Sequence, residues 1–150
     1  MPKLAAQETR TFFLTLVTAN RRRVFQVHEN ANLLLTIFSD DRAKSRYAIH
    51  AFAVMPDHVH VLFTPAKEIS FEKAVQFIKG GFSFRLKSKM DVWQKGYNEH
   101  RIKDASDYDH HVTYIHENPA EAHLSESYPF TSAKMPHLVD PGPVHLTTRG

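Results

Sequence analysis

The distribution of hydrophobic and polar residues predicts four β-strands, two of which form a hairpin. Residues 11–18 are rich in β-branched and aromatic side chains, which favour extended structure, and a basic turn follows them. The turn residues Pro56 and Asp57 separate two further extended segments, so these segments are expected to pair as a hairpin. The three later predicted strands span residues 47–55, 58–64 and 92–102, the last with an internal bend.

Apolar residues that recur at helical spacing predict three helices, of which the first spans residues 29 to about 44. The second opens at Ser70, a residue type that caps helix N-termini, and is interrupted by Gly80 and Gly81. A glycine costs about 1 kcal/mol in a helix interior. The pair therefore indicates either a close approach of another element or a break in the helix.

The third helix is predicted from about residue 105, capped by Asp104, to Asn118. Pro119 disfavours helical geometry at the residue before it, which places Asn118 near the last turn. From Ser125 onwards the sequence has little periodicity and several prolines. This segment is expected either to wrap the surface or to be disordered.

The order strand, helix, strand, strand, helix, strand predicts an α+β fold. The expected form is a ferredoxin-like sandwich, in which helices pack on one face of an antiparallel sheet and the other face stays open. At 150 residues the chain fits a single domain, 1–150. Its core is expected at about residues 11–132, and residues 133–150 form a tail that is a candidate for disorder.

Composition narrows the class of protein only slightly. The chain is 42% hydrophobic and contains no apolar run near the roughly 18 residues that cross a bilayer, so no membrane partner is expected. The first ten residues lack the apolar core of a signal peptide, and the cytoplasm is the default location. Without cysteine there is neither a disulfide nor a thiolate metal site.

Positive charge gathers in two short segments of a chain whose net charge is +3, which fits a polyanion partner. Aromatic residues lie between the charges of the second segment, as on many surfaces that bind nucleic acid. A solvated surface over the edge of the core explains either segment equally well. The candidate nucleic-acid contacts are Arg21, Arg22, Arg23, Lys79, Arg85, Lys87 and Lys89.

Two histidines, His58 and His60, stand one residue apart in an otherwise apolar strand. Side chains alternate along a strand, so both project from one face while the flanking valines line the core face. Their neutral nitrogens are able to converge on one cation. Two solvent-facing histidines are the simpler interpretation in a chain with 11 histidines, and on this pair alone it carries more weight.

A second pair lies on the third predicted helix, where Tyr114 and Asn118 are four residues apart and share a face. His110 or His111 lies one turn earlier on nearly the same side. Tyrosines often anchor helices and Asn-Pro often ends them, so the pair has an ordinary structural interpretation. If the helix faces the histidine strand, however, it places a nucleophile beside a metal ion.

The stretch "MPDHVHVLF" resembles the histidine-hydrophobic-histidine (HUH) motif of single-tyrosine transposases. "HHVTYIHENPAEAHL" resembles the tyrosine helix of the REP-associated tyrosine transposases. Four other segments agree in order and spacing, so that the resemblance covers roughly residues 11–132. They are "TFFLTLVTANRRRVF", "IKGGFSFRLK", "VWQKGYNEHRIKD" and "YPFTSA".

The resemblance implies a ferredoxin-like HUH endonuclease that nicks and rejoins single-stranded DNA at hairpins, using a divalent metal and a covalent phosphotyrosine. By motif match, His58 and His60 are expected to bind the metal, with Asn118 as the third ligand and Tyr114 as the nucleophile. In this family the active site is completed within one chain or between two. The chain is therefore expected to be a monomer or a homodimer.

The residue types suit this chemistry on their own terms. Two imidazoles and an amide are neutral, so a bound divalent ion keeps its full charge to polarise a phosphate. Imidazole ligands alone would favour Mn²⁺, Co²⁺ or Zn²⁺, whereas the resemblance points to Mg²⁺ or Mn²⁺. Tyr108 falls on a different helix face from Tyr114, which argues against a mechanism with two tyrosines.

Two other classes of function remain open at this point. One is a non-catalytic nucleic-acid-binding module on the same fold, which would bind without metal and tolerate Tyr114→Phe. The other is a small metal-dependent hydrolase with an activated water, which would turn over without a covalent adduct. Neither explains why Tyr114 and Asn118 share a helix face.

Overall fold

The computed structural model describes residues 10–143 and 146. Three short 3-10 turns accompany seven regular elements, and none of the described helices is both long and apolar enough to cross a membrane. The strands are β1 (Phe12–Val17), β2 (Tyr47–Met55), β3 (His58–Pro65) and β4 (Asn98–Arg101). The helices are α2 (His28–Ala43), α3 (Phe71–Leu86) and α4 (Ala105–Glu121).

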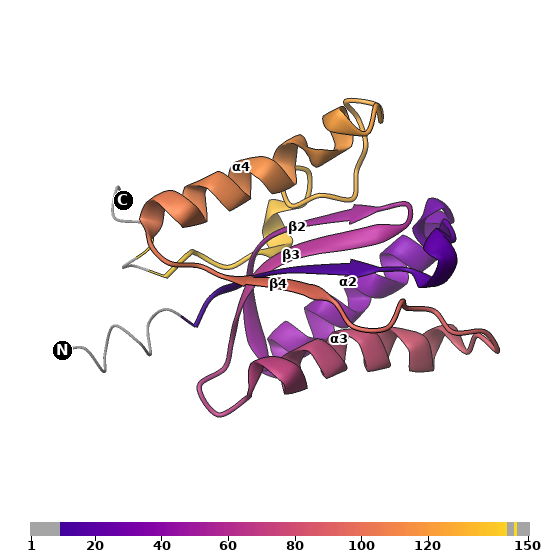
Figure 1. Cartoon of the computed structure of the whole chain (residues 1–150), viewed down its shortest axis with the longest axis horizontal. Helices are drawn as coiled ribbons and strands as arrows, with labels where there is room; N and C mark the ends of the chain where they lie inside the picture. Colours follow the sequence, from indigo (N-terminus) through magenta and orange to yellow (C-terminus); the bar gives the residue numbers. More distant parts are fainter. Residues whose placement is uncertain (1–9, 144–145, 147–150) are drawn as a thin grey trace.

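The four strands form one antiparallel sheet in the order β2-β3-β1-β4. β2 and β3 are the predicted hairpin, and β1 lies between β3 and β4 (Figure 1). The α+β class and the ferredoxin-like arrangement are confirmed. α2 and α3 lie together on one face of this sheet, as predicted (Figure 1).

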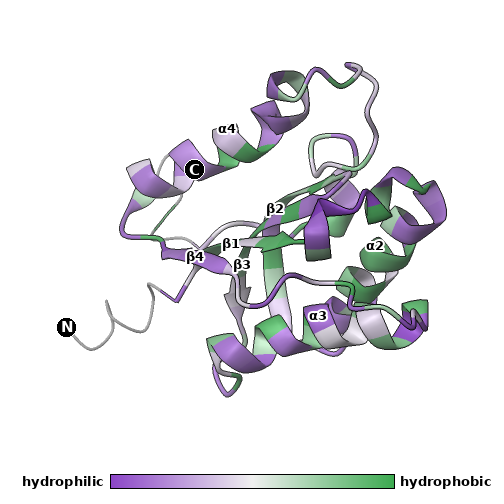
Figure 2. Ribbon diagram, turned by 45° about the vertical axis from the view of Figure 1, so that its right-hand side comes forward, coloured by the Kyte–Doolittle hydropathy of each residue, from purple (hydrophilic) through white to green (hydrophobic). Residues whose placement is uncertain are grey.

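The main core lies between the sheet and these two helices. It takes the alternate side chains of β3, Val59, Val61 and Phe63, all fully buried. The same alternation directs His58 and His60 to the opposite face, as the sequence predicted. In Figure 2 the central strands are largely hydrophobic, whereas β4 and much of α4 are hydrophilic.

The expectation that the second sheet face stays open is wrong, because α4 covers it (Figure 1). Ile115 is fully buried there against a second cluster that includes Ala51, Met55 and Leu62. The physical reason lies in β2, whose residues 51–55 are all buried. A strand that is apolar on both faces must be covered on both faces.

α3 runs without interruption through Gly80 and Gly81, so the predicted alternative of a break is wrong. A Cβ on Gly81 would lie 3.5 Å from Cγ2 of Ile37, which is an ordinary packing distance to α2. Ser70 is the N-cap, and its side chain accepts a hydrogen bond from the Lys73 amide. The helix therefore tolerates its glycines through tertiary packing rather than local propensity.

The ends of two other elements differ from the prediction. α4 begins at the predicted N-cap, Asp104, but continues past Pro119 to Glu121, so Asn118 lies within its last turn. The fourth strand is shorter than predicted, because residues 92–97 form a loop joined to β1 only at the isolated bridge of Thr18 with Trp93. The bend within this segment is at Gly96, whose φ of 74° suits glycine.

The segment from residue 125 to residue 143 wraps the surface, one of its two predicted alternatives. It runs beside β2, where the Val54 amide donates to the Phe130 carbonyl over 2.9 Å. Further along, Arg42 of α2 forms an ion pair with Asp140 at 2.8 Å. The rest of the tail predicted to be a candidate for disorder, residues 144–145 and 147–150, lies outside the described residues.

Candidate active site

The paired histidines of β3 lie side by side on the sheet face that α4 covers. Their ring centroids are 4.8 Å apart. His60 is buried, whereas His58 is partly exposed at the end of the strand. The two imidazoles therefore line one wall between the sheet and α4.

α4 supplies the opposite wall. The Asn118 side-chain oxygen lies 3.4 Å from Nε2 of His58. The Tyr114 ring centroid is 5.5 Å from that of His60, and 45% of Tyr114 is exposed. The structure thus brings together all four residues that the sequence singled out.

Each histidine has a partner on its other ring nitrogen. Asp57 Oδ1 lies 2.8 Å from Nδ1 of His58, and the Thr15 hydroxyl lies 3.0 Å from Nδ1 of His60. Both Nδ1 atoms are therefore occupied, and Nε2 is the nitrogen of each ring that is able to bind a cation. Sequence reasoning treated Asp57 only as a turn residue and missed Thr15, which reaches His60 only through the β1–β3 pairing.

Burial and charge set the ionisation of these groups. Burial, reinforced by the nearby His58, lowers the pKa of His60 to about 3, so this ring is neutral at physiological pH. Partial burial would raise the pKa of Asp57, but hydrogen bonds and charge from His58 and Arg21 lower it below its usual value. The site therefore combines a neutral imidazole with a carboxylate that orients its neighbour.

Phe13 of β1 contacts both walls of the site. Its ring stacks on His60 with centroids 5.3 Å apart and meets Tyr114 edge-on at 5.9 Å. It also contacts His111, at 4.7 Å. Phe13 holds the tyrosine beside the histidines, a role that its position in an apolar strand did not reveal.

The donor set fits a divalent ion. Nε2 of His58, Nε2 of His60 and the Asn118 oxygen are neutral donors on adjoining walls, and water or phosphate oxygens would complete the coordination. The C-terminal turn of α4 adds partial negative charge beside Asn118, which favours a cation there. An exposed phenol next to such an ion suits attack on a phosphate.

His110 and His111, the residues considered as helpers of Tyr114, take different positions. His110 is exposed. The Nδ1 of His111 lies 2.9 Å from the Asp107 carbonyl oxygen, which directs that nitrogen along the helix. Its link to the tyrosine runs through their shared neighbour Phe13.

Only one of the predicted nucleic-acid contacts joins the site directly. Arg21 pairs with Asp57 at 3.2 Å and so touches the group that orients His58. Arg22 donates to the carbonyl of Asp91, and Arg23 donates to the side chain of Gln26 over 3.0 Å.

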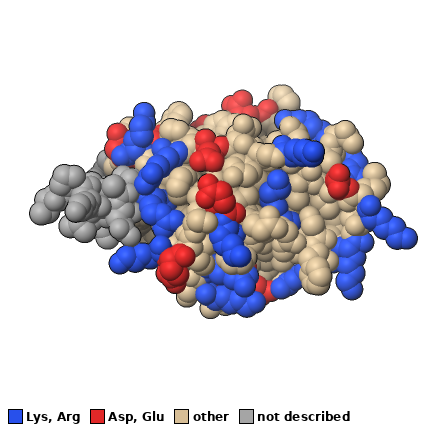
Figure 3. All heavy atoms as spheres, turned by 60° about the horizontal axis from the view of Figure 1, so that its bottom comes forward, with Lys and Arg blue, Asp and Glu red and all other residues tan. Residues whose placement is uncertain are grey.

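The predicted contacts on α3 lie across the sheet from Tyr114. Arg85 pairs with Asp40 at 2.7 Å, and Lys87 is the left-handed C-cap of the helix. Lys79 donates to the carbonyls of Gln94 and Gly96, and burial lowers its pKa. On the face shown in Figure 3 the basic side chains are scattered, with acidic ones between them.

The chain matches known proteins over most of its length. Residues 8–118, a range that includes both histidines, Tyr114 and Asn118, match the sequence model of a family described as transposase IS200 like. Over 112 residues the chain is 32% identical to the REP-associated tyrosine transposase of Escherichia coli strain K12, covering 74% of this chain and 67% of that protein. It is also similar to a solved REP-associated tyrosine transposase bound to a REP hairpin, with a TM-score of 0.74 and 26% identity, covering 90% of this chain and 84% of that one.

Proposed function

The chain belongs to the IS200-like transposase family, and from this premise we propose that it cuts and rejoins single-stranded DNA at hairpins through a covalent bond to Tyr114. The observation that carries the proposal is the convergence of Tyr114 with His58, His60 and Asn118 between β3 and α4. A structural role alone would not require an exposed phenol beside two imidazoles whose Nδ1 atoms are already occupied.

The ion in this proposal is Mg²⁺ or Mn²⁺, held by His58, His60 and Asn118. When bound, it would polarise the scissile phosphate and stabilise the charge that develops on its oxygens. The chain prepares for this by keeping His60 neutral through burial and by orienting His58 with Asp57. Both arrangements leave nitrogen lone pairs for the ion.

The reacting group of the chain is the Tyr114 hydroxyl. Its oxygen attacks phosphorus, a bond forms between that oxygen and the 5′-phosphate, and the bond to the 3′-oxygen of the neighbouring nucleotide breaks. The phenol gives up its proton to solvent and the departing 3′-oxygen takes one up, so that the departing strand ends in a 3′-hydroxyl. A phenol has a pKa of about 10, so it is a weak nucleophile but a good leaving group. A second 3′-hydroxyl is therefore able to reverse the reaction and rejoin DNA without ATP.

The proposed substrate is a DNA hairpin with an adjoining single strand. The similar solved protein is bound to a REP hairpin, and here Tyr114 is open to solvent, as a passing strand requires. Enzymes that act on single strands avoid the cost of opening a duplex. Arg21 would be the first backbone contact at the site, beside Asp57, and Arg22 and Arg23 follow it in the chain. Lys79, Arg85 and Lys87 belong to α3 across the sheet, so they would contact only DNA that passes around the molecule, which binds as a monomer or homodimer.

The test is a denaturing gel with hairpin oligonucleotides drawn from the DNA that flanks the gene. The label is placed at the 3′ end, because a 5′-phosphotyrosine retains the 3′ fragment of the strand. Wild type is compared with Tyr114→Phe, with Mn²⁺ or EDTA present. Tyr97→Phe is the matched control, since Tyr97 is also exposed but lies on the loop before β4.

We expect labelled DNA at the mass of the protein in wild type and in Tyr97→Phe, only with metal, and none in Tyr114→Phe. Cleavage that persists in Tyr114→Phe would replace the proposal with a hydrolase that uses an activated water. If the chain binds every hairpin without metal and produces neither a cut nor an adduct, it acts as a nucleic-acid-binding module and not as an enzyme.

A further inference from the structure

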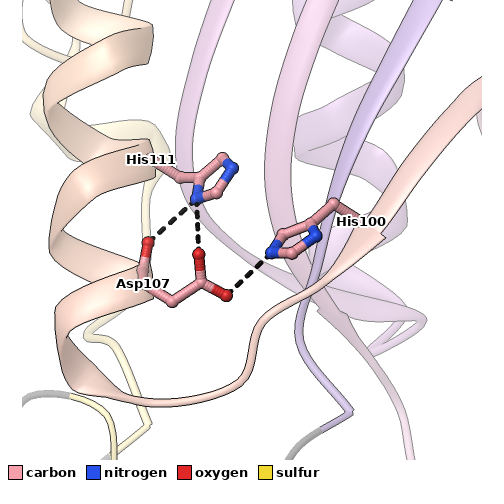
Figure 4. A group of neighbouring side chains, drawn as sticks. All are labelled: His100, Asp107 and His111. Carbon is pink, nitrogen blue, oxygen red and sulfur yellow. Dashed lines mark hydrogen bonds and ion pairs between the residues drawn. The ribbon is translucent and has the colours of Figure 1, made fainter.

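A second group of metal-binding side chains lies between β4 and the start of α4 (Figure 4). Nε2 of His100 lies 2.7 Å from Oδ2 of Asp107. Nδ1 of His111 lies 3.2 Å from Oδ1 of the same carboxylate. The two imidazole rings stack at a centroid distance of 4.8 Å and an angle of 19°. Three donor groups from two elements thus face one small space.

We propose that His100, Asp107 and His111 bind a second divalent ion, of the Zn²⁺ class. One donor atom from each residue lies within 4.8 Å of the other two. Ligands of a tetrahedral zinc ion lie about 2.0–2.2 Å from the metal, and so roughly 3.4 Å from one another. The separations of 2.7 Å from His100 and 3.2 Å from His111 to the two Asp107 oxygens are both shorter than this value, so small side-chain rotations would open the space for the ion.

The chemistry of the donors selects a different ion from the one at Tyr114. Two imidazoles and one carboxylate are a common zinc set, with the fourth position left for water. The carboxylate also gives this group a negative charge that the neutral set of His58, His60 and Asn118 lacks. Imidazole with carboxylate suits late first-row ions, whereas Mg²⁺ prefers oxygen ligands throughout.

The surroundings hold the carboxylate in place without closing the site. The Lys103 amide donates to Oδ2 of Asp107 over 2.8 Å, which orients the group and leaves Oδ1 toward His111. An ion would replace the Nδ1 proton of His111, which otherwise faces Oδ1 and the Asp107 carbonyl. The side chain of His100 is 39% exposed, so the ion has a route in from solvent.

The position of the group gives it a consequence for the rest of the molecule. His100 belongs to the short outer strand β4, whereas Asp107 and His111 belong to the first turns of α4. An ion shared by them would cross-link the strand to the helix that carries Tyr114, one turn beyond His111. Ion binding should therefore raise the stability of the folded chain.

The test is Zn²⁺ binding by the full chain, measured by calorimetry and by the melting temperature. The background is His58→Ala with His60→Ala, which removes the other candidate site. Within it, His100→Asn and His111→Asn are compared with His110→Asn, which removes a neighbouring exposed imidazole outside the group. If the background protein fails to fold, the number of Zn²⁺ ions bound by wild type is compared with the number bound by His100→Asn.

We expect one Zn²⁺ per background chain, with a higher melting temperature. Affinity should fall at least tenfold in His100→Asn and His111→Asn, because loss of even an outer partner of a ligand costs roughly 10–100-fold. When His58 and His60 are kept, the His100→Asn variant should bind one Zn²⁺ ion fewer than wild type. No Zn²⁺ binding, or equal affinity in His100→Asn and His110→Asn, would overturn the proposal. The cleavage test at Tyr114 can fail without affecting this result, since calorimetry requires no DNA.

Discussion

Truncating Ile115 should weaken the packing of α4, the helix of the candidate active site, against the sheet, since this side chain is the apolar anchor between Tyr114 and Asn118. Ile115 is fully buried on the face that α4 shares with Leu62 and Met55. Ile115→Ala removes three carbon groups, each worth about 0.8 kcal/mol of transfer free energy. The cavity left behind brings the expected loss of unfolding free energy to about 3–4 kcal/mol. Ile115→Val keeps most of the packing and should cost about 1 kcal/mol.

The assay is urea unfolding followed by far-ultraviolet circular dichroism and by fluorescence of the single tryptophan, Trp93. Trp93 packs against Phe25 and Phe82, on the other side of the sheet from α4, so its fluorescence reports on that face, whereas circular dichroism reports on all helices and strands together. We expect both transitions to shift together, because the strands under α4 also form the main core. Formation of the DNA adduct should fall in parallel with stability.

The matched control is Thr113→Ala, an exposed position on the same helix, which should change unfolding free energy by less than about 0.5 kcal/mol. A cost below about 1 kcal/mol for Ile115→Ala would refute the reasoning, since any well-packed isoleucine costs more. Equal costs for Ile115→Ala and Ile115→Val would refute it as well.

Three further predictions concern stability. Asp140→Asn breaks the two-point contact with Arg42 and should cost about 1–2 kcal/mol in urea unfolding; an unchanged midpoint would show that the tail is not anchored there. Burial lowers the pKa of His50 in the folded chain. The stability that depends on this imidazole being neutral is therefore complete above the unfolded pKa of about 6.5 and is lost as the pH falls below that value. Melting temperatures between pH 7.5 and 5 in EDTA should therefore fall less in His50→Gln than in wild type, and parallel curves would contradict this. Gly81→Ala should stabilise the chain by up to about 1 kcal/mol, because the new methyl group meets Ile37 at 3.5 Å; a lower melting temperature would mean that α2 and α3 cannot accept it.

The sequence predicted the helices and strands, and the residues that share a face within each of them, better than it predicted which elements pack together. Alternation along β3 was enough to place His58 and His60 on one face, and helical spacing was enough to align Tyr114 with Asn118. Sequence spacing cannot show that α4 faces β3, because the residues concerned lie about 60 positions apart. Only the family resemblance indicated this contact. His100 escaped notice for the same reason: its neighbours on α4 become visible only once β4 pairs with β1.

The open face was predicted wrongly although the sequence held the evidence. "YAIHAFAVM" is apolar at consecutive positions, which is typical of a strand covered on both sides rather than on one. The expectation of an open face came with the ferredoxin-like sandwich and not from this segment. The exact ends of α4 and β4 also differ from the prediction, because α4 continues through a buried Pro119 and Gly96 turns the chain with a positive φ just before β4.

The course of the chain after α4 determines where a fragment that still folds can end. The family match stops at residue 118, yet the backbone groups of β2 are satisfied by residues that come later. The carbonyl of Phe130 accepts from Val54, and the amides of Ser132 and Asp140 donate to Phe52 and Ile49. A protein shortened to the family match would leave an apolar strand with unpaired hydrogen-bonding groups at its edge, the arrangement that seeds aggregation. Expression boundaries for this chain therefore belong beyond Asp140, even though the candidate catalytic residues all precede Pro119.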